Sequence, residues 1–305
     1  MNKLKHLATA LLVTCFATPT VAEDKIPVNI GFPPAVHFLP VMMSAENGCF
    51  EEQGLDVTLT IIPIVTSIGP SLLGGSLQIG MSTPTSLLAA GDNGLPIVAI
   101  AGASRLIKDN ESISIVSRAG TTVSSAEDLA GKKVGVPGVL SVGDLVFRAW
   151  LDQSIDSSSV TYVETPFPRM AEMLKAGTVD AVLAADPARS GIVAAGLGER
   201  AGVEFWSAVF KDSIQTLWTS SKTWAEDNPT AIEGFRACLE EGITAIAEDP
   251  EKAIEVQKQY LQFSIQDLPD FTTTVSADDL AAYLPITEAY DVTRNDLDTS
   301  TLVLE

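Results

Sequence analysis

Hydroxyl and charged side chains stand at the starts of several expected helices. Ser67, Thr83 and Ser141 each precede a segment with helical character. The free N–H groups of a helix start, together with a hydroxyl, can bind an anion, although plain N-capping explains such residues equally well. Arg169 also opens an expected helix, where a cation opposes the helix dipole. Either an anionic ligand or an acidic neighbour such as Glu164 or Glu172 must therefore favour a cation at this position.

Aromatic and imidazole side chains extend this candidate ligand-binding set. His37 is the only histidine beyond residue 22, so a multi-histidine metal site is excluded and no metal is expected. It is either a hydrogen-bonded loop residue or a ligand contact. Phe38, Phe167 and Trp218 could stack on a planar ligand or pack in a core or hinge. The remaining candidates follow expected strands: Pro34, Thr66, Ser82, Leu140 and Asp186.

Catalytic patterns are not found. The sequence lacks HExxH and a GxxxxGK[ST] phosphate loop. Ser141 lies in Gly138-Val139-Leu140-Ser141-Val142-Gly143, which misses the GxSxG elbow by one position. Any Ser/His/Asp arrangement would have to use His37. The sequence therefore favours a binding protein without a cofactor over an enzyme.

Strand and helix signals alternate, which predicts an α/β fold with mostly parallel sheets. In such sheets ligands bind beyond the carboxyl ends of the strands. All the candidate loops follow expected strands in this way. Those strands cover residues 28–32, 55–62 and 77–81 in the first half, and 133–136, 160–163 and 179–184 in the second.

A repeat divides the chain into two lobes. Ile30-Gly31-Phe32-Pro33 returns 104 residues later as Val134-Gly135-Val136-Pro137. Leu72-x-x-Gly75-x-Leu77 returns 102 residues later as Leu174-x-x-Gly177-x-Val179. A nearly constant offset predicts two lobes of one design, with equivalent loops facing each other across a cleft.

The expected lobes are joined by two crossings. Residues 23–116 and 219–305 are assigned to lobe one, and residues 117–218 to lobe two, with crossings near Ser117 and Thr219. Expected helices over 230–247, 250–260 and 277–290 complete lobe one. A hinge of two segments permits closure around a ligand.

The first 22 residues resemble a secretory signal peptide. Lys3 and Lys5 precede a short apolar run, and Ala22 suits cleavage; Cys15 as a lipid anchor is the alternative, which the preceding Thr14 disfavours. Without these 22 residues the chain has 17 basic and 39 acidic side chains, which gives a formal charge of −22. Such a charge excludes nucleic acid as a partner and suits a freely diffusing monomer. Cys49 and Cys238 then remain, to pair in an oxidising compartment or to be buried as thiols.

Three segments in this order resemble the NMT1/THI5-like substrate-binding proteins. They are Val28 to Phe32 followed by Glu46 to Val57, Asp128 to Val136, and Gly177 to Val182. The resemblance implies a type II, Venus-flytrap fold and a periplasmic protein that delivers a small organic solute to the permease of an ABC importer. Relatives take sulfonates, taurine, nitrate, pyrimidine precursors or aromatic acids.

Departures from the family pattern leave the solute open. Ala185-Asp186-Pro187 stands where relatives often carry Trp-Glu-Pro, and Arg169 replaces an acidic residue. The His/Cys-rich run of the pyrimidine-synthesising branch is absent. The expectation is an anion such as a carboxylate or sulfonate, with aromatic acids included. An exported enzyme on the same fold, or a sensor subunit, is the alternative.

Overall fold

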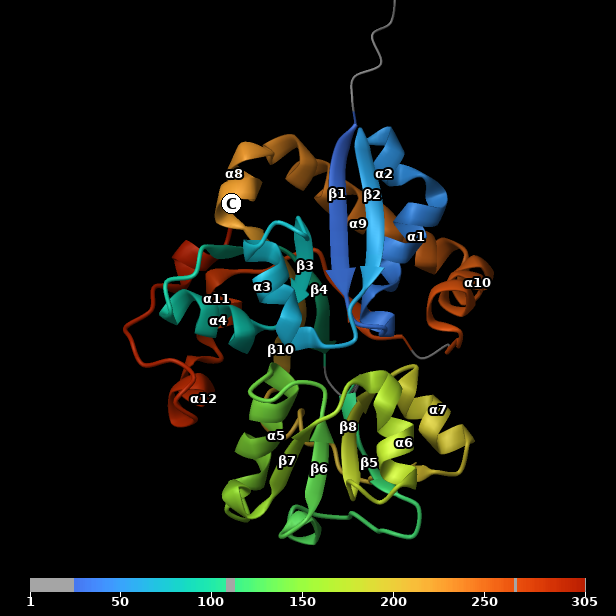
Figure 1. Cartoon of the computed structure of the whole chain (residues 1–305), viewed down its shortest axis with the longest axis vertical. Coiled ribbons are helices and arrows are strands. Elements are labelled where there is room, and N and C mark those ends of the chain that lie inside the picture. The colour runs from blue at the N-terminus through green and yellow to red at the C-terminus, as the bar shows by residue number, and fades with distance from the viewer. Residues whose placement is uncertain (1–24, 108–112, 266–267, 305) are drawn as a thin grey trace, which may run out of the picture.

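The computed structural model describes residues 25–107, 113–265 and 268–304. The expected signal peptide therefore lies outside the described residues. The chain forms two lobes, one above the other in Figure 1, each built from a sheet with flanking helices. Among the described helices, none has the length and apolarity needed to cross a bilayer.

Lobe one holds a six-stranded sheet. Its strand order is β11 (Asp270–Phe271), β4 (Ile97–Ile107), β10 (Asp212–Ser221), β3 (Ile79–Ser82), β1 (Ile26–Phe32) and β2 (Leu55–Ile61). Its helices are α1 (Leu39–Asn47), α2 (Cys49–Glu52), α3 (Ile68–Leu73), α4 (Pro84–Asp92), α8 (Lys222–Asp227), α9 (Pro229–Glu248), α10 (Pro250–Leu261), α11 (Ala277–Ala281) and α12 (Leu284–Ala289). The single helix expected over 277–290 is thus two short ones.

Lobe two holds a five-stranded sheet. Its strand order is β7 (Thr161–Glu164), β6 (Lys133–Val136), β8 (Ala181–Ala185), β5 (Ile113–Arg118) and β9 (Gly198–Arg200). Its helices are α5 (Val142–Leu151), α6 (Met170–Lys175) and α7 (Ala188–Ala194). Strands β6, β7 and β8 are parallel, and β8 is apolar and fully buried, while β5 and β9 are antiparallel additions.

The sequence repeat corresponds to equivalent positions in the two sheets. Strand β1 pairs in parallel with β2 and β3, as β6 does with β7 and β8. Gly75 follows α3 with φ of 75°, and Gly177 follows α6 with φ of 68°. Both turns need this left-handed conformation, which glycine adopts without a steric penalty. The predicted two-lobe design is therefore confirmed.

The crossings differ from the predicted boundaries. Strand β5 pairs with β8, so residues 113–116 belong to lobe two. Strand β10 pairs with β4 from Asp212↔Ile107 to Ser221↔Ile97, so residues 212–218 belong to lobe one. The boundary at 218/219 was wrong because β10 begins at Asp212, well before Trp218. The boundary at 116/117 was wrong because it falls inside β5, whose pairing partners β8 and β9 both belong to lobe two. The chain crosses before β5 and again before β10.

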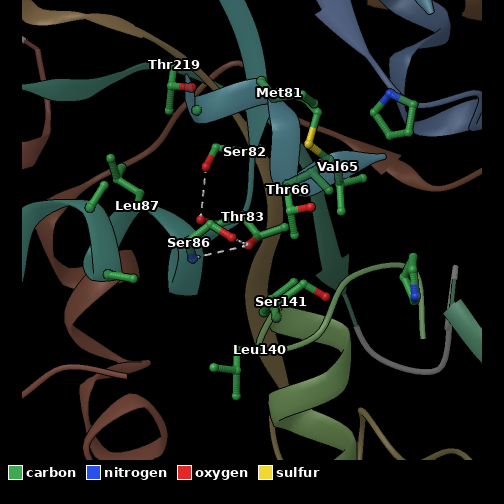
Figure 2. Close-up of a pocket in the computed structure, with 18 of the residues that line it drawn as sticks. Val65, Thr66, Met81, Ser82, Thr83, Ser86, Leu87, Leu140, Ser141 and Thr219 are labelled. Atoms are coloured by element: carbon green, nitrogen blue, oxygen red, sulfur yellow. Dashed lines mark hydrogen bonds between the residues drawn. The ribbon is translucent and has the colours of Figure 1, made fainter. Parts of the chain in front are cut away.

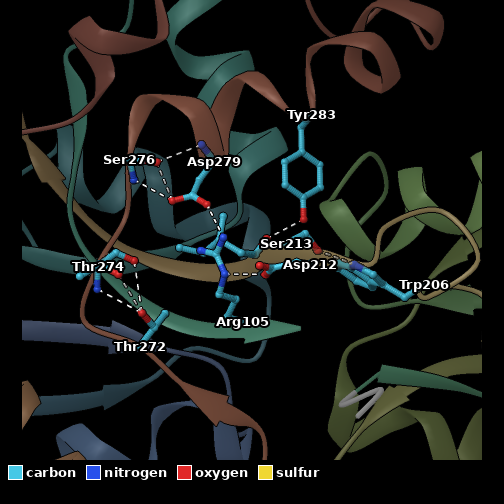
Figure 3. A network of polar contacts seen from close by, with 10 residues as sticks. Arg105, Trp206, Asp212, Ser213, Thr272, Thr274, Ser276, Asp279 and Tyr283 are labelled. Carbon is cyan, nitrogen blue, oxygen red and sulfur yellow. Dashed lines mark hydrogen bonds and ion pairs between the residues drawn. The ribbon is translucent and has the colours of Figure 1, made fainter. Parts of the chain in front are cut away.

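A polar network fixes the base of β10 (Figure 3). Arg105 on β4 pairs with Asp212 at 2.6 Å and with Asp279 of α11 at 2.8 Å. The indole N–H of Trp206 donates to the Ser213 hydroxyl at 3.0 Å. These contacts hold the end of the return crossing firmly against lobe one.

Lobe one is closed by a disulfide between α2 and α9. The Sγ atoms of Cys49 and Cys238 lie 2.05 Å apart, with Cα atoms 5.7 Å apart. Helix α9 packs closely on α1 at Gly242, where a Cβ would come within 2.1 Å of the Pro40 carbonyl oxygen. The open question of cysteine pairing is thus resolved in favour of a bond, which fits an oxidising compartment.

Candidate functional site

A cavity of about 520 Å³ lies between the lobes. Its walls include loops that follow the carboxyl ends of β1, β2 and β3 in lobe one and of β6, β7 and β8 in lobe two. The lobes also touch beside the cavity, where the Val36 N–H donates to the Asp186 carbonyl at 3.1 Å. Thr66 donates to Glu164 at 3.5 Å across the same gap. The loops selected from the strand ends therefore meet at one place.

Hydroxyl groups line one side of the cavity. Ser82, Thr83 and Ser86 gather at the start of α4, with Thr66 close by (Figure 2). The Thr83 hydroxyl caps α4 by accepting from the Ser86 N–H at 3.3 Å and also contacts the Ser86 hydroxyl at 2.9 Å. Hydroxyls can donate to or accept from a ligand, so this group suits a polar part of a solute.

The start of α5 already carries its own negative charge. Asp144 is buried in the first turn, accepts from the Leu140 N–H at 2.8 Å and pairs with Arg148 at 3.0 Å. Burial raises the pKa of Asp144. Ser141 precedes the helix and makes no capping bond with its side chain, so its hydroxyl remains at the cavity wall. The positive end of the dipole of α5 is therefore compensated without a ligand.

His37 is buried at the wall and faces charged groups of the other lobe. Its Nε2 atom finds no hydrogen-bond partner within the described part of the chain. Burial, and next the Arg189 guanidinium, lower the pKa of His37 to about 4. The imidazole is therefore neutral at neutral pH and can offer a nitrogen to a bound ligand.

Behind these polar groups the walls are largely apolar. Phe38 and Phe167 line the cavity, while Trp218 packs behind Phe38 with ring centroids 5.3 Å apart. Trp218 also contacts Phe235 in the core of lobe one. The core-packing reading of Trp218 therefore holds, and the stacking role remains open to Phe38 and Phe167.

Eight of the thirteen predicted site residues line the cavity. They are His37, Phe38, Thr66, Ser82, Thr83, Leu140, Ser141 and Phe167. Pro34, Ser67, Asp186 and Trp218 do not; Ser67 instead donates to the Ile64 carbonyl at 2.7 Å, and Asp186 pairs with Arg189 beneath the wall.

Arg169 also lies outside the cavity, contrary to expectation. Its side chain is 60% exposed and pairs with Glu172 at 2.8 Å. The surface ion pair, which was the rival explanation, is what the structure shows. The acid at the next helical turn satisfies the cation locally. Within the described residues, Asp291 is the one lining side chain with a full charge, and no Lys or Arg lines the cavity.

Several lining residues were not predicted from the sequence. They lie on the facing sides of α3 and α4 and at the ends of distant segments: Ile68, Leu72, Leu73, Leu87, Ala90, Leu95, Thr216, Thr219 and Val292. Most look like ordinary core positions in the sequence. Only the packing of the two helices shows that a space remains between them.

Metal chemistry finds no support in the described residues. No group of three or more His, Cys, Asp or Glu side chains is placed to hold an ion there. The binding surface instead consists of hydroxyls, one neutral imidazole, the Asn93 amide, the Asp291 carboxylate and mostly apolar side chains. Such a surface can enclose and orient an organic molecule by hydrogen bonds and burial.

The chain is similar in sequence to a transport protein and to an enzyme. A taurine-binding periplasmic protein of Escherichia coli K12 is 26% identical over 193 residues, 63% of this chain and 58% of that protein. A yeast pyrimidine phosphate synthase, THI5 of Saccharomyces cerevisiae, is 29% identical over 120 residues, 39% of this chain and 34% of that enzyme. The chain thus spans less than two thirds of the length of either curated relative.

Fold and family agree. The alkanesulfonate-binding protein SsuA of Xanthomonas axonopodis pv. citri, solved with MOPS, superposes with a TM-score of 0.79 at 15% identity, over 93% of this chain and 99% of that one. This likeness shows the periplasmic-binding-protein fold. The family described as NMT1/THI5 like matches residues 35–253. The chain, with a cavity between its two lobes, therefore belongs to the NMT1/THI5-like family.

Proposed function

We propose that this protein captures a small organic solute between its lobes and delivers it to an ABC importer. The observation that carries the proposal is the cavity of about 520 Å³ between the two lobes, lined by loops from both. At about 30 Å³ per water molecule, that space equals about 17 waters, so an inorganic anion would leave most of it empty. Pockets of roughly this size bury whole organic ligands.

The proposed location is the periplasm and the proposed partner is a membrane permease. The signal-peptide pattern of residues 1–22 and the disulfide between Cys49 and Cys238 both suit export. The printed names of relatives, a taurine-binding and an alkanesulfonate-binding protein, support the same role. Closure of the two lobes would create a surface that marks the loaded state.

The relatives' names favour an anionic solute, whereas the described walls do not require one. The hydroxyl of Thr83 and the carboxylate of Asp144 already serve the two helix starts. Desolvating an anion is costly unless charge-assisted hydrogen bonds replace its water. The ligand's charge is therefore a question for measurement, and both anions and uncharged solutes belong in the screen.

The rival function is an enzyme of the pyrimidine-synthesising kind, supported by the yeast relative's name. His37 is the single described histidine, and its pKa is lowered to about 4. A neutral imidazole with so low a pKa is a weak base at neutral pH. These features support binding without turnover.

Native mass spectrometry of freshly purified protein, followed by a thermal-shift screen, tests the proposal. The screen covers carboxylates, sulfonates, heterocycles and uncharged amides and alcohols. A solute at about 100 times its dissociation constant stabilises the fold by about 2.7 kcal/mol. Chemical conversion of a tightly bound solute by the pure protein would overturn the transport role. Scattering should show a smaller radius of gyration on saturation, and an unchanged radius would refute closure.

A further inference from the structure

The cavity continues past the hydroxyl groups into lobe one. Its walls there come from α3 and α4 and from the loop after α4, and we name this part the tail channel: Ile68, Leu72, Leu73, Leu87, Ala90 and Leu95. It follows α4 from Thr83 to beyond Asn93, and the nine residues of α4 span about 13 Å. Thr219 on β10 and Met81 on β3 form the floor. The cavity is therefore elongated, with a polar part at the cleft.

The inner walls of the tail channel belong to the rigid core. Ile68 and Leu72 on α3 and Leu87 on α4 are each 2% exposed or less. Gly80 beneath them has no side chain, and a Cβ there would come within 2.6 Å of Ile68. Helix α3 is thus packed onto the sheet below, while a space stays between it and α4. Closely packed interiors do not collapse readily into such a space.

The outer end of the channel is marked by exposed apolar side chains. The described residues include seven large apolar side chains that are strongly exposed, and four of them line this cavity: Leu73, Leu95, Val139 and Leu140. Leu73 and Leu95, at the channel end, are 40% and 42% exposed. Single exposed apolar residues are ordinary, but a group around one cavity indicates a ligand that covers them.

We propose that the solute is amphipathic, with a polar group at the hydroxyls of Ser82, Thr83 and Ser86 and an apolar chain in the tail channel. This inference rests on the proposed solute-binding function and names the class of solute. Hydroxyls and the His37 imidazole can satisfy a polar head of either charge state, whereas the channel offers mainly apolar contacts, with the Asn93 amide near its outer end. Length of the apolar chain, rather than charge, sets the affinity.

Titration calorimetry with straight-chain compounds from ethyl to decyl tests the inference. Three series are used, 1-alkanols, alkyl carboxylates and 1-alkanesulfonates, so that the head group is varied separately from the chain. Each methylene that enters the channel should tighten binding about fourfold, which corresponds to about 0.8 kcal/mol. The gain should stop once the chain reaches Leu95.

Leu95→Glu provides the matched perturbation. A carboxylate at the end of the channel should weaken octyl compounds at least about tenfold, because burying an unpaired charge is unfavourable, and leave ethyl compounds unchanged. Val193→Glu is the control, since Val193 on α7 is similarly exposed at 44% but lies outside the cavity. Unchanged ethyl affinity in Leu95→Glu also shows that the variant is folded.

Three results would overturn the tail channel as a chain-binding site. They are equal affinity for short and long chains, an undiminished gain per methylene in Leu95→Glu, and no binding by any member of the three series. None of these touches the solute-binding proposal, which fails only if native mass spectrometry and the wider screen find no bound solute or find turnover.

Discussion

Removing His37 should change how stability depends on pH. The pKa of the buried imidazole is lowered from 6.5 to about 4. At 1.36 kcal/mol per pKa unit, that difference amounts to about 3 kcal/mol between the folded and unfolded proteins. Because the folded pKa is the lower one, the unfolded chain binds a proton first as pH falls. Stability is therefore unaffected above about pH 6.5 and is lost progressively between about 6.5 and 4.

Urea unfolding of wild type and His37→Gln across this range measures the effect. The variant cannot gain a proton at this position. Between pH 7 and 4 its free energy of unfolding should therefore fall by about 3 kcal/mol less than that of wild type. Carboxylates contribute equally to both proteins and cancel in the difference. His6 lies in residues 1–22, so processed protein without a histidine tag carries one imidazole.

Nuclear magnetic resonance titration of that single imidazole provides the independent check. A resonance that moves with a midpoint near 6.5 in the folded protein would refute the reasoning, as would identical pH slopes in wild type and His37→Gln. Either result would mean that water or a counter-charge reaches the ring. The Arg189 guanidinium across the lobe interface is the second cause of the shift, so Arg189→Gln should raise the His37 midpoint.

Three further predictions concern single side chains. Arg169→Ala should leave solute affinity within about twofold and stability within about 0.5 kcal/mol, measured by calorimetry and urea unfolding, because the exposed pair with Glu172 contributes little. Cys238→Ser should lower the free energy of unfolding by up to about 5 kcal/mol, because it removes the cross-link that closes a loop of 189 residues. Under reducing conditions wild type also lacks the bond, so urea unfolding should then give the two proteins the same stability. Phe235→Ala should lose about 3–5 kcal/mol by urea unfolding, since this fully buried ring packs on Phe50; a loss below 1 kcal/mol would refute close packing there.

The features that the sequence predicted correctly are those that a local residue pattern or the order of elements determines. Gly75 and Gly177 located equivalent turns because a left-handed residue after a helix is a local requirement. Thr83 and Ser141 were found because the strand-end rule depends only on the order of elements. Both lie on the cavity wall.

The sequence-based predictions that were wrong or missing concern residues whose positions depend on side-chain packing between helices and strands. Arg169 stands at a strand end, yet its direction is set by Glu172 one turn away. Trp218 was placed at a crossing, but pairing of β10 with β4 and β3 puts it in the sheet of lobe one. Leu73, Leu87 and Leu95 gave no functional signal, since nothing in an apolar residue's type distinguishes a filled core from an open channel.

The disulfide between Cys49 and Cys238 closes residues 49–238 into a covalent loop, from which the two terminal segments extend. All of lobe two, and both crossings, lie between the two joined cysteines. A protease that cuts once anywhere in lobe two therefore releases no fragment. Apart from the one water taken up in the cut, the nicked protein keeps all its mass until a reductant is added, and the disulfide holds the amino-terminal and carboxyl-terminal portions of lobe one together. A cut in lobe two would thus leave the two portions of lobe one covalently joined.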